Sequence, residues 1–235
     1  MFHRWLSIAV FSGVLVGCSS DDNNTVDSAS LDTAQFEMQI VNATLAQPLS
    51  PVAAILHNSD YRAWVDGTEA SVAIEQMAEA GNNADLLAEA SADTDVFSTT
   101  SGDGPVGGGA EAVLSLEAEA SGPVYLTMAS MLVNTNDAFT GINALLVSDL
   151  DVGQSTTIYA PVWDAGTEQN TELAGSIPGP ADGGEGFNAS RTGDLNRIVF
   201  HQGVITRDDG LDTSVLDQSH RFVSPAVKVI VTRTQ

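Results

Sequence analysis

The sequence predicts an all-β protein, an antiparallel β-sandwich with a small helical insertion. Residues 36–40 and 112–118 alternate apolar and polar side chains with a period of two, as half-buried strands do. Five other segments are rich in Val, Ile, Tyr and Phe and are bounded by Gly, Asn, Asp or Pro, which is typical of strands. These segments are 123–133, 141–147, 155–162, 196–205 and 224–234.

Residues 69–90 are the exception to this strand pattern. Val72, Ile74 and Met77 recur near helical spacing among Glu and Ala. Gly81, followed by two asparagines, is expected to divide the segment into two short helices. The strands do not alternate regularly with helices, so a parallel βαβ sheet is disfavoured.

Composition and charge restrict the possible partners. The chain of 235 residues has 8 Lys+Arg against 31 Asp+Glu, a formal net charge of −23, and 43% hydrophobic residues. Nucleic acids and anionic lipid headgroups are poor partners, because both need basic side chains and Lys228 is the only lysine. A field this negative concentrates cations instead. One cysteine excludes a disulfide within the chain.

The first 18 residues have the features of a secretory signal. Arg4 precedes an apolar run over residues 6–16, which is too short to span a bilayer as a mature helix. The run ends in Leu-Val-Gly-Cys and resembles the bacterial lipobox, so Cys18 is predicted to be the acylated first residue of the mature chain. Ser19 implies, by resemblance to enteric lipoproteins, an outer-membrane lipoprotein, periplasmic or surface-exposed.

The sequence divides into three parts on this interpretation. Residues 1–17 are the signal peptide, and residues 18–34 form a flexible tether. The tether is rich in Ser, Asp, Asn and Thr and has almost no large apolar residue, so it cannot offset the entropy cost of ordering. Residues 35–235 are the sandwich domain.

Three acidic or amide-rich loops, 134–137, 164–168 and 182–187, are candidates for a cation site. Calcium takes about six to eight oxygen ligands from carboxylates, amides and carbonyls. Asp164 and Glu168 flank Gly166, which permits a tight turn that directs both carboxylates to one centre. Spacing alone leaves open that these loops are ordinary solvated turns.

Signs of catalysis are few. There is no G-x-S-x-G motif, and the mature chain has only His57, His201 and His220. His201 lies within a strand pattern, where a histidine is usually a half-buried sheet residue. His201 and His220 lack the helical spacing of a zinc site. We therefore expect no enzyme activity.

Residues 131–141 and 159–168 resemble the spondin domain, which is known from F-spondin, the mindins and many bacterial secreted proteins. Residues 36–45 and 184–187 and the closing valine-rich strand resemble its bacterial branch. The resemblance covers about residues 35–233. The extracellular cysteines and thrombospondin-type repeats of the animal proteins are absent.

This resemblance implies a C2-like antiparallel sandwich of about eight strands with a bound calcium ion (Ca2+). The family's metal ligands correspond here to Asp137, Asp164 and Glu168. Glu168 replaces the commoner aspartate and lengthens that ligand by one methylene group.

Together, these features predict a lipid-anchored, calcium-binding module of the cell envelope that acts in binding or adhesion. Its membrane contact would be the anchor at Cys18, and its ligand an extracellular or periplasmic protein or glycan. The alternative from another class is a secreted metal-dependent hydrolase. A calcium-dependent membrane binder is disfavoured, because such proteins present basic residues around the calcium loops.

Overall fold

The computed structural model describes residues 32–193 and 195–235. The expected signal peptide, the acylation site Cys18 and most of the expected tether lie outside the described residues. The first strand begins at Asp32, three residues before the expected start of the domain. In the described part of the chain, no helix is both long and apolar enough to cross a membrane.

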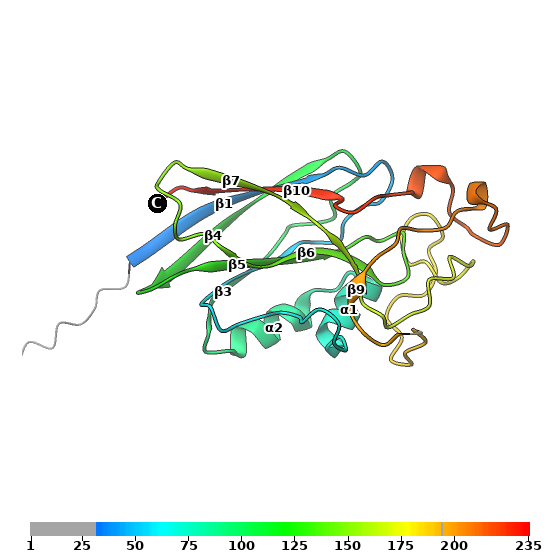
Figure 1. Ribbon diagram of the computed structural model, residues 1–235, viewed down its shortest axis with the longest axis horizontal. Helices are drawn as coiled ribbons and strands as arrows, with labels where there is room; N and C mark the ends of the chain where they lie inside the picture. The colour runs from blue at the N-terminus through cyan, green and yellow to red at the C-terminus, as the bar shows by residue number, and fades with distance from the viewer. Residues whose placement is uncertain (1–31, 194) are drawn as a thin grey trace, which may run out of the picture. The chain divides into compact units, whose positions relative to one another are not determined.

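The described residues form two antiparallel sheets, and two helices cover the outer face of one of them (Figure 1). The smaller sheet has the order β4-β1-β10-β7 and the larger has the order β3-β2-β5-β6-β8-β9. The strands are β1 (Asp32–Asn42), β2 (Ala53–His57), β3 (Val96–Ser101), β4 (Glu111–Ala120), β5 (Tyr125–Met131), β6 (Ala138–Leu146), β7 (Ser155–Ala160), β8 (Val162–Asp164), β9 (Val199–Phe200) and β10 (Val227–Arg233). The predicted all-β sandwich with a helical insertion is confirmed.

The four-stranded sheet follows the alternation seen in the sequence. In β4, Leu114 and Leu116 are buried, whereas Ser115 and Glu117, which follow them in alternation, are exposed. β1 pairs with β4 so that Phe36 lies opposite Leu116. One face of this sheet therefore meets solvent and the other meets the second sheet.

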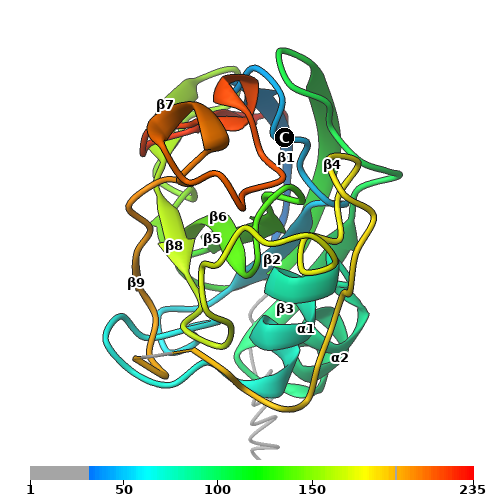
Figure 2. The same cartoon turned by 90° about the vertical axis from the view of Figure 1, so that its right-hand side faces the viewer.

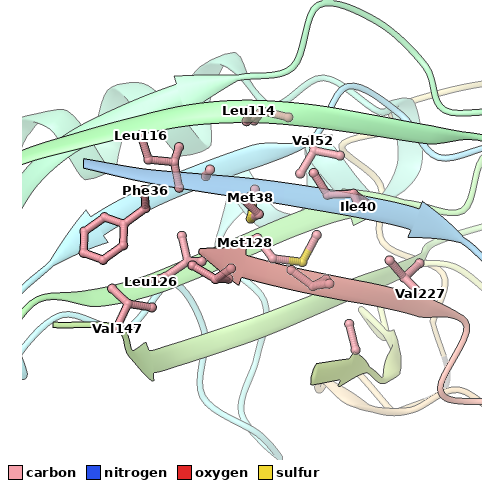
Figure 3. Packing of buried hydrophobic residues seen from close by; sticks show 14 of the residues in the cluster. Phe36, Met38, Ile40, Val52, Leu114, Leu116, Leu126, Met128, Val147 and Val227 are labelled. Carbon is pink, nitrogen blue, oxygen red and sulfur yellow. The ribbon is translucent and has the colours of Figure 1, made fainter. Parts of the chain in front are cut away.

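The main core lies between the two sheets (Figure 3). Phe36, Met38 and Ile40 of β1 pack toward Leu126 and Met128 of β5, and all five side chains are at most 2% exposed. This apolar burial is the dominant favourable contribution to folding.

The central strands β2 and β5 of the six-stranded sheet are buried on both faces. In β5, Leu126 and Met128 belong to the main core, whereas Ala129 belongs to a second core beneath the helices. In β2, all five residues are buried. A strand covered on both sides has no alternation of apolar and polar residues, and β2 was not predicted for that reason; β3, the edge strand beside it, was not predicted either.

The helical insertion consists of α1 (Val72–Ala80) and α2 (Ala84–Ala92). Ser71 caps the start of α1, because its side chain accepts a hydrogen bond from the backbone N–H of Ile74. Gly81 caps the end of α1 in the left-handed conformation (φ 68°), which glycine adopts without steric cost. The predicted division of the helical segment at Gly81 is confirmed.

Two predicted strands differ from those observed. The segment 155–162 divides at Pro161 into β7, in the four-stranded sheet, and β8, in the six-stranded sheet. A proline has no N–H to donate to a ladder, so the chain changes sheets there. Of residues 196–205, only Val199–Phe200 form a strand.

Long loops gather at one end of the sandwich, away from the C-terminus (Figures 1 and 2). They include the chain between β8 and β9 and the chain between β9 and β10, which has the short 3-10 helices Arg207–Asp209 and Gln218–His220. The predicted metal ligands lie at this end, which we call the loop end.

Candidate metal centre

Asp137 is held immediately before β6 by a tight turn. The hydroxyl of Thr135 donates to the carbonyl of Leu132 (2.6 Å) and accepts from the N–H of Ala138 (3.0 Å). These bonds fix the backbone on both sides of Asp137, whose side chain is 0% exposed. The folded backbone therefore holds Asp137 in the interior of the domain.

Asp164 reaches the same place through sheet pairing. It ends β8 and lies opposite Ala138 of β6, next to Asp137 in the chain. Its Oδ1 accepts the N–H of Gly166 (2.7 Å) and its Oδ2 accepts the amide of Asn170 (2.6 Å). Gly166 has φ 73°, and a Cβ there would lie 2.4 Å from the carbonyl oxygen of Arg197. Only glycine fits this turn.

The two carboxylate oxygens of Asp137 have different surroundings. Oδ2 accepts from the backbone N–H groups of Thr167 (2.8 Å) and Glu168 (3.0 Å), and from the hydroxyl of Thr167 (3.3 Å). Oδ1 is buried and has no hydrogen-bond partner. An unpaired buried carboxylate oxygen is costly unless a proton or a cation satisfies it.

The electrostatics of Asp137 agree with this geometry. Burial, and after it the neighbouring charge of Asp164, raise the pKa of Asp137 to about 7 against the lowering effect of the three hydrogen bonds. Poor solvation and the nearby charge of Asp164 therefore both disfavour the ionised form of Asp137.

Glu168 is less closely joined to this pair than the sequence suggested. Its Oε2 lies 3.5 Å from the amide nitrogen of Asn136. Burial raises the pKa of Glu168 to about 7, and the largest contribution from a neighbouring charge is that of Glu79, ahead of Asp137. Within residues 32–193 and 195–235, no group of three or more His, Cys, Asp or Glu side chains is arranged to hold a metal ion.

The donor chemistry still fits a hard cation at Asp137 and Asp164. The Oδ1 of Asp137 accepts no hydrogen bond, so its lone pairs are free to coordinate a cation. Carboxylate oxygens are the donors that calcium prefers. Glu168 would complete such a site only with its carboxylate turned away from Asn136.

In the third acidic loop, residues 182–187, Asp182 accepts hydrogen bonds from the neighbouring backbone. Oδ2 of Asp182 accepts the N–H groups of Gly175 (2.6 Å) and Ile177 (3.3 Å). Glu185 adds negative charge near Glu168. The loop thus contributes to the electrostatic field of the site through Glu185, whereas Asp182 stabilises a turn.

His57 and His201 are both buried, and Nε2 of His201 has no hydrogen-bond partner. His201 is 5% exposed, its Nδ1 accepts the N–H of Gly203 (2.9 Å), and burial lowers its pKa. His57 lies 2.8 Å through Nε2 from the hydroxyl of Thr127, a pairing that the sequence did not indicate. Both of these residues are 0% exposed, so a substrate cannot reach this hydroxyl in the folded protein.

The fold and the loop end define a β-sandwich domain with buried acids at one end. The Spondin_N family model matches residues 39–176, more than half of the chain, and includes all three predicted ligands. The chain belongs to the Spondin_N family. A search of curated proteins returned no match.

Glu79 is the residue of this region that the sequence interpretation missed. It lies on α1, is 1% exposed, and is the acid that most affects the pKa of Glu168 among charged neighbours. Its position on an expected helix was visible in the sequence. The contact between that helix and the loop after β8 was not, because it depends on how the insertion packs.

Proposed function

We propose that this chain is a binding or adhesion module of the cell envelope, without enzymatic activity, and that its spondin domain holds a calcium ion at the loop end. Membership of the Spondin_N family supports the modular role. The observation that carries the metal assignment is the buried, unpartnered Oδ1 of Asp137 beside Asp164. Asp137 and Asp164 would hold the ion, with Glu168 as the third carboxylate.

The role of calcium in this proposal is structural. When bound, it supplies positive charge that converts repulsion among buried carboxylates into coordination. Asp137 fixes residues 167 and 168 through its Oδ2, so neutralising this carboxylate would steady the loops that follow β8. Those loops form the end of the sandwich that we propose as the contact surface for a protein or glycan.

Calorimetry of the purified protein with calcium and with chelator tests the metal assignment. A ligand that binds only the folded state stabilises it by about 2.7 kcal/mol at a hundredfold excess over Kd, which corresponds to a rise of several degrees in Tm. Identical melting in both conditions, with no heat on titration with calcium, would contradict the calcium assignment, and these loops would then be ordinary turns.

A matched pair of variants locates the effect. Asp164→Asn removes one charge at nearly constant shape and should abolish most of the calcium-dependent rise in Tm. Asp212→Asn changes an exposed aspartate in a separate turn and should leave that rise intact. An equal response in both variants would place the ion elsewhere.

The envelope location rests on the sequence pattern around Cys18. Cys18→Ser should release the protein from the membrane fraction in a bacterial host, because no acylated anchor can form. Retention of this variant at normal abundance contradicts the lipoprotein assignment. Capture of surface or periplasmic material by the purified protein, with and without chelator, then tests the binding role, and turnover in a hydrolase screen would favour the metal-dependent hydrolase instead.

A further inference from the structure

Glu79 is a buried acid with an unpaired oxygen. It lies in the last turns of α1 and is 1% exposed. Its Oε2 accepts the N–H of Asn188 (2.9 Å), whereas its Oε1 is buried and has no hydrogen-bond partner. The same condition holds for Oδ1 of Asp137, so two elements distant in the sequence each present an unsatisfied carboxylate oxygen.

Glu75, one turn earlier on α1, is a natural comparison. It is 2% exposed and its Oε1 also has no hydrogen-bond partner, but its Oε2 forms an ion pair with Nη2 of Arg191 (2.7 Å), which Glu79 lacks. Arg191 also pairs with Glu69 (2.6 Å) and donates to the carbonyl of Ala70 (2.8 Å). The guanidinium group of Arg191 is thus bound to residues at the start of α1. Of the causes that shift the pKa of Glu79, the charge of Arg191 is the smallest.

Glu79 faces the loop that contains the proposed metal ligands. The hydroxyl of Thr167, which has one proton to donate, is within hydrogen-bonding reach of both Glu79 and Oδ2 of Asp137. Glu168, the next residue, has Glu79 as its strongest charged neighbour. In Figure 2, the yellow segment that follows β8 passes beside α1. Thr167 therefore connects the carboxylate of α1 to the carboxylate before β6.

This arrangement places buried acids around one loop, and the basic side chain that acts on the pKa of Glu79, Arg191, has the smallest effect there because it is paired with Glu75 and Glu69. Isolated buried carboxylates lose favourable solvation by water unless they are protonated or paired. Hydrogen bonds from Asn188 and Thr167 satisfy part of the acceptor capacity of these acids, but supply no full positive charge. A hard divalent cation supplies that charge and accepts several oxygen ligands at once.

We propose that Glu79 is a further ligand of the cation site, so that α1 and the loop 164–168 share one divalent ion. This inference rests on the proposed calcium site and extends it to the helical insertion. A bound cation would also draw the carboxylate of Glu168 away from Asn136, since the negative charges of both Glu79 and Asp137 act on it.

Calcium titration calorimetry on wild type, Glu79→Gln and Glu75→Gln tests the proposal. We expect wild type to bind one ion. Glu79→Gln should weaken binding by about tenfold or more, a magnitude typical of altered metal surroundings. Glu75→Gln should change the affinity by less than about threefold, because the carboxylate that it removes is already paired with Arg191.

A second measurement separates ligation from a structural effect. Hydrogen exchange of α1 amides should slow on addition of calcium in wild type and in Glu75→Gln, but not in Glu79→Gln. All three proteins are compared in chelator first, where Glu79→Gln should melt within a few degrees of wild type. If Glu79→Gln does not fold, Glu79→Asp keeps the charge, shortens the side chain and should also weaken binding.

The outcomes distinguish this inference from the function on which it rests. Equal calcium affinity in wild type and both Glu79 variants would overturn the role of Glu79 and leave the calcium site intact. Two ions in wild type, with one retained in Glu79→Gln, would overturn a shared site in favour of two separate ones. No binding by wild type would overturn the proposed calcium site itself.

Discussion

The core between the sheets and the interior of the loop end exclude water equally but are stabilised differently. Met38 and Asp137 are both 0% exposed. Met38 is surrounded by apolar side chains of both sheets (Figure 3), and its burial is favourable by itself. Asp137 is fixed by hydrogen bonds yet keeps an unpaired oxygen beside another acid. The first region is complete within the chain, whereas the second requires a proton or a cation.

The largest expected effect on stability comes from a substitution in the core between the sheets. Phe36→Ala should lower the free energy of unfolding by about 3–5 kcal/mol, because it removes a buried ring and leaves a cavity between the sheets. Val113→Ala, on the neighbouring β4 where Val113 is 55% exposed, should cost less than about 0.5 kcal/mol. Chemical denaturation measures both. A similar cost for the two variants would mean that the contacts between the sheets are not the main source of stability.

The second core, beneath the helices, should be sensitive to added volume. A Cβ at Gly141 would lie 2.7 Å from the Trp64 ring and 2.8 Å from the carbonyl oxygen of Met128. Gly141→Ala should therefore cost about 1–3 kcal/mol. Gly104→Ala, where a Cβ meets nothing within 4 Å, is the matched control. Thermal melting that ranks the two variants equally would contradict the close packing of Trp64 on β6.

The buried acids of the loop end predict that the stability of the protein in chelator falls as the pH rises. Burial raises to about 7 the pKa values of Asp137 and of Glu172, a 2% exposed residue of the chain between β8 and β9. Both values lie above those in the unfolded chain. The folded state therefore binds more protons than the unfolded state below pH 7, so stability falls as the pH rises through 7. Between pH 6.5 and pH 8 we expect a loss of about 1–2 kcal/mol from these two groups.

This window also limits interference from the histidines. Burial lowers the pKa values of His57 and His201, so their effect on stability appears mainly as the pH falls below 6.5. Excess calcium should reduce the loss at pH 8, because metal binding requires deprotonated carboxylates. A chelated protein that melts higher at pH 8 than at pH 6.5 would contradict the raised pKa values.

The smallest expected effect concerns the start of the helix that carries Glu79. Ser71→Ala removes the hydrogen bond to the N–H of Ile74 (3.2 Å) and should cost about 1 kcal/mol. Ser71→Asp keeps a capping oxygen and should restore stability to near the wild-type value. Equal melting of Ser71→Ala and wild type would show that packing alone sets the start of α1.

The sequence predicted the parts of the fold that have one buried face. β4 shows the alternation of a half-buried strand, and Gly81 marks the break between the helices. β2 was missed because both of its faces are covered, which removes the alternation. The change of sheet at Pro161 was missed because the residues on either side of it form a single apolar and β-branched run.

The candidate site could be predicted only in part for a similar reason. Asp137, Asp164 and Glu168 stand out in the sequence as acids in loops. The pairing of β6 with β8 brings the first two together, and the packing of α1 on the six-stranded sheet sets Glu79 against Glu168. Spacing along the chain does not report either contact.

The sequence by itself determined the sandwich class, the helical insertion and which acids are candidates for the site, because periodicity, turn residues and charge are local properties of the chain. Only the tertiary structure decided which acids are buried without partners, and that Glu79 rather than Asp182 faces Glu168. Desolvation and charge proximity cause this difference, and both depend on which distant segments pack against one another.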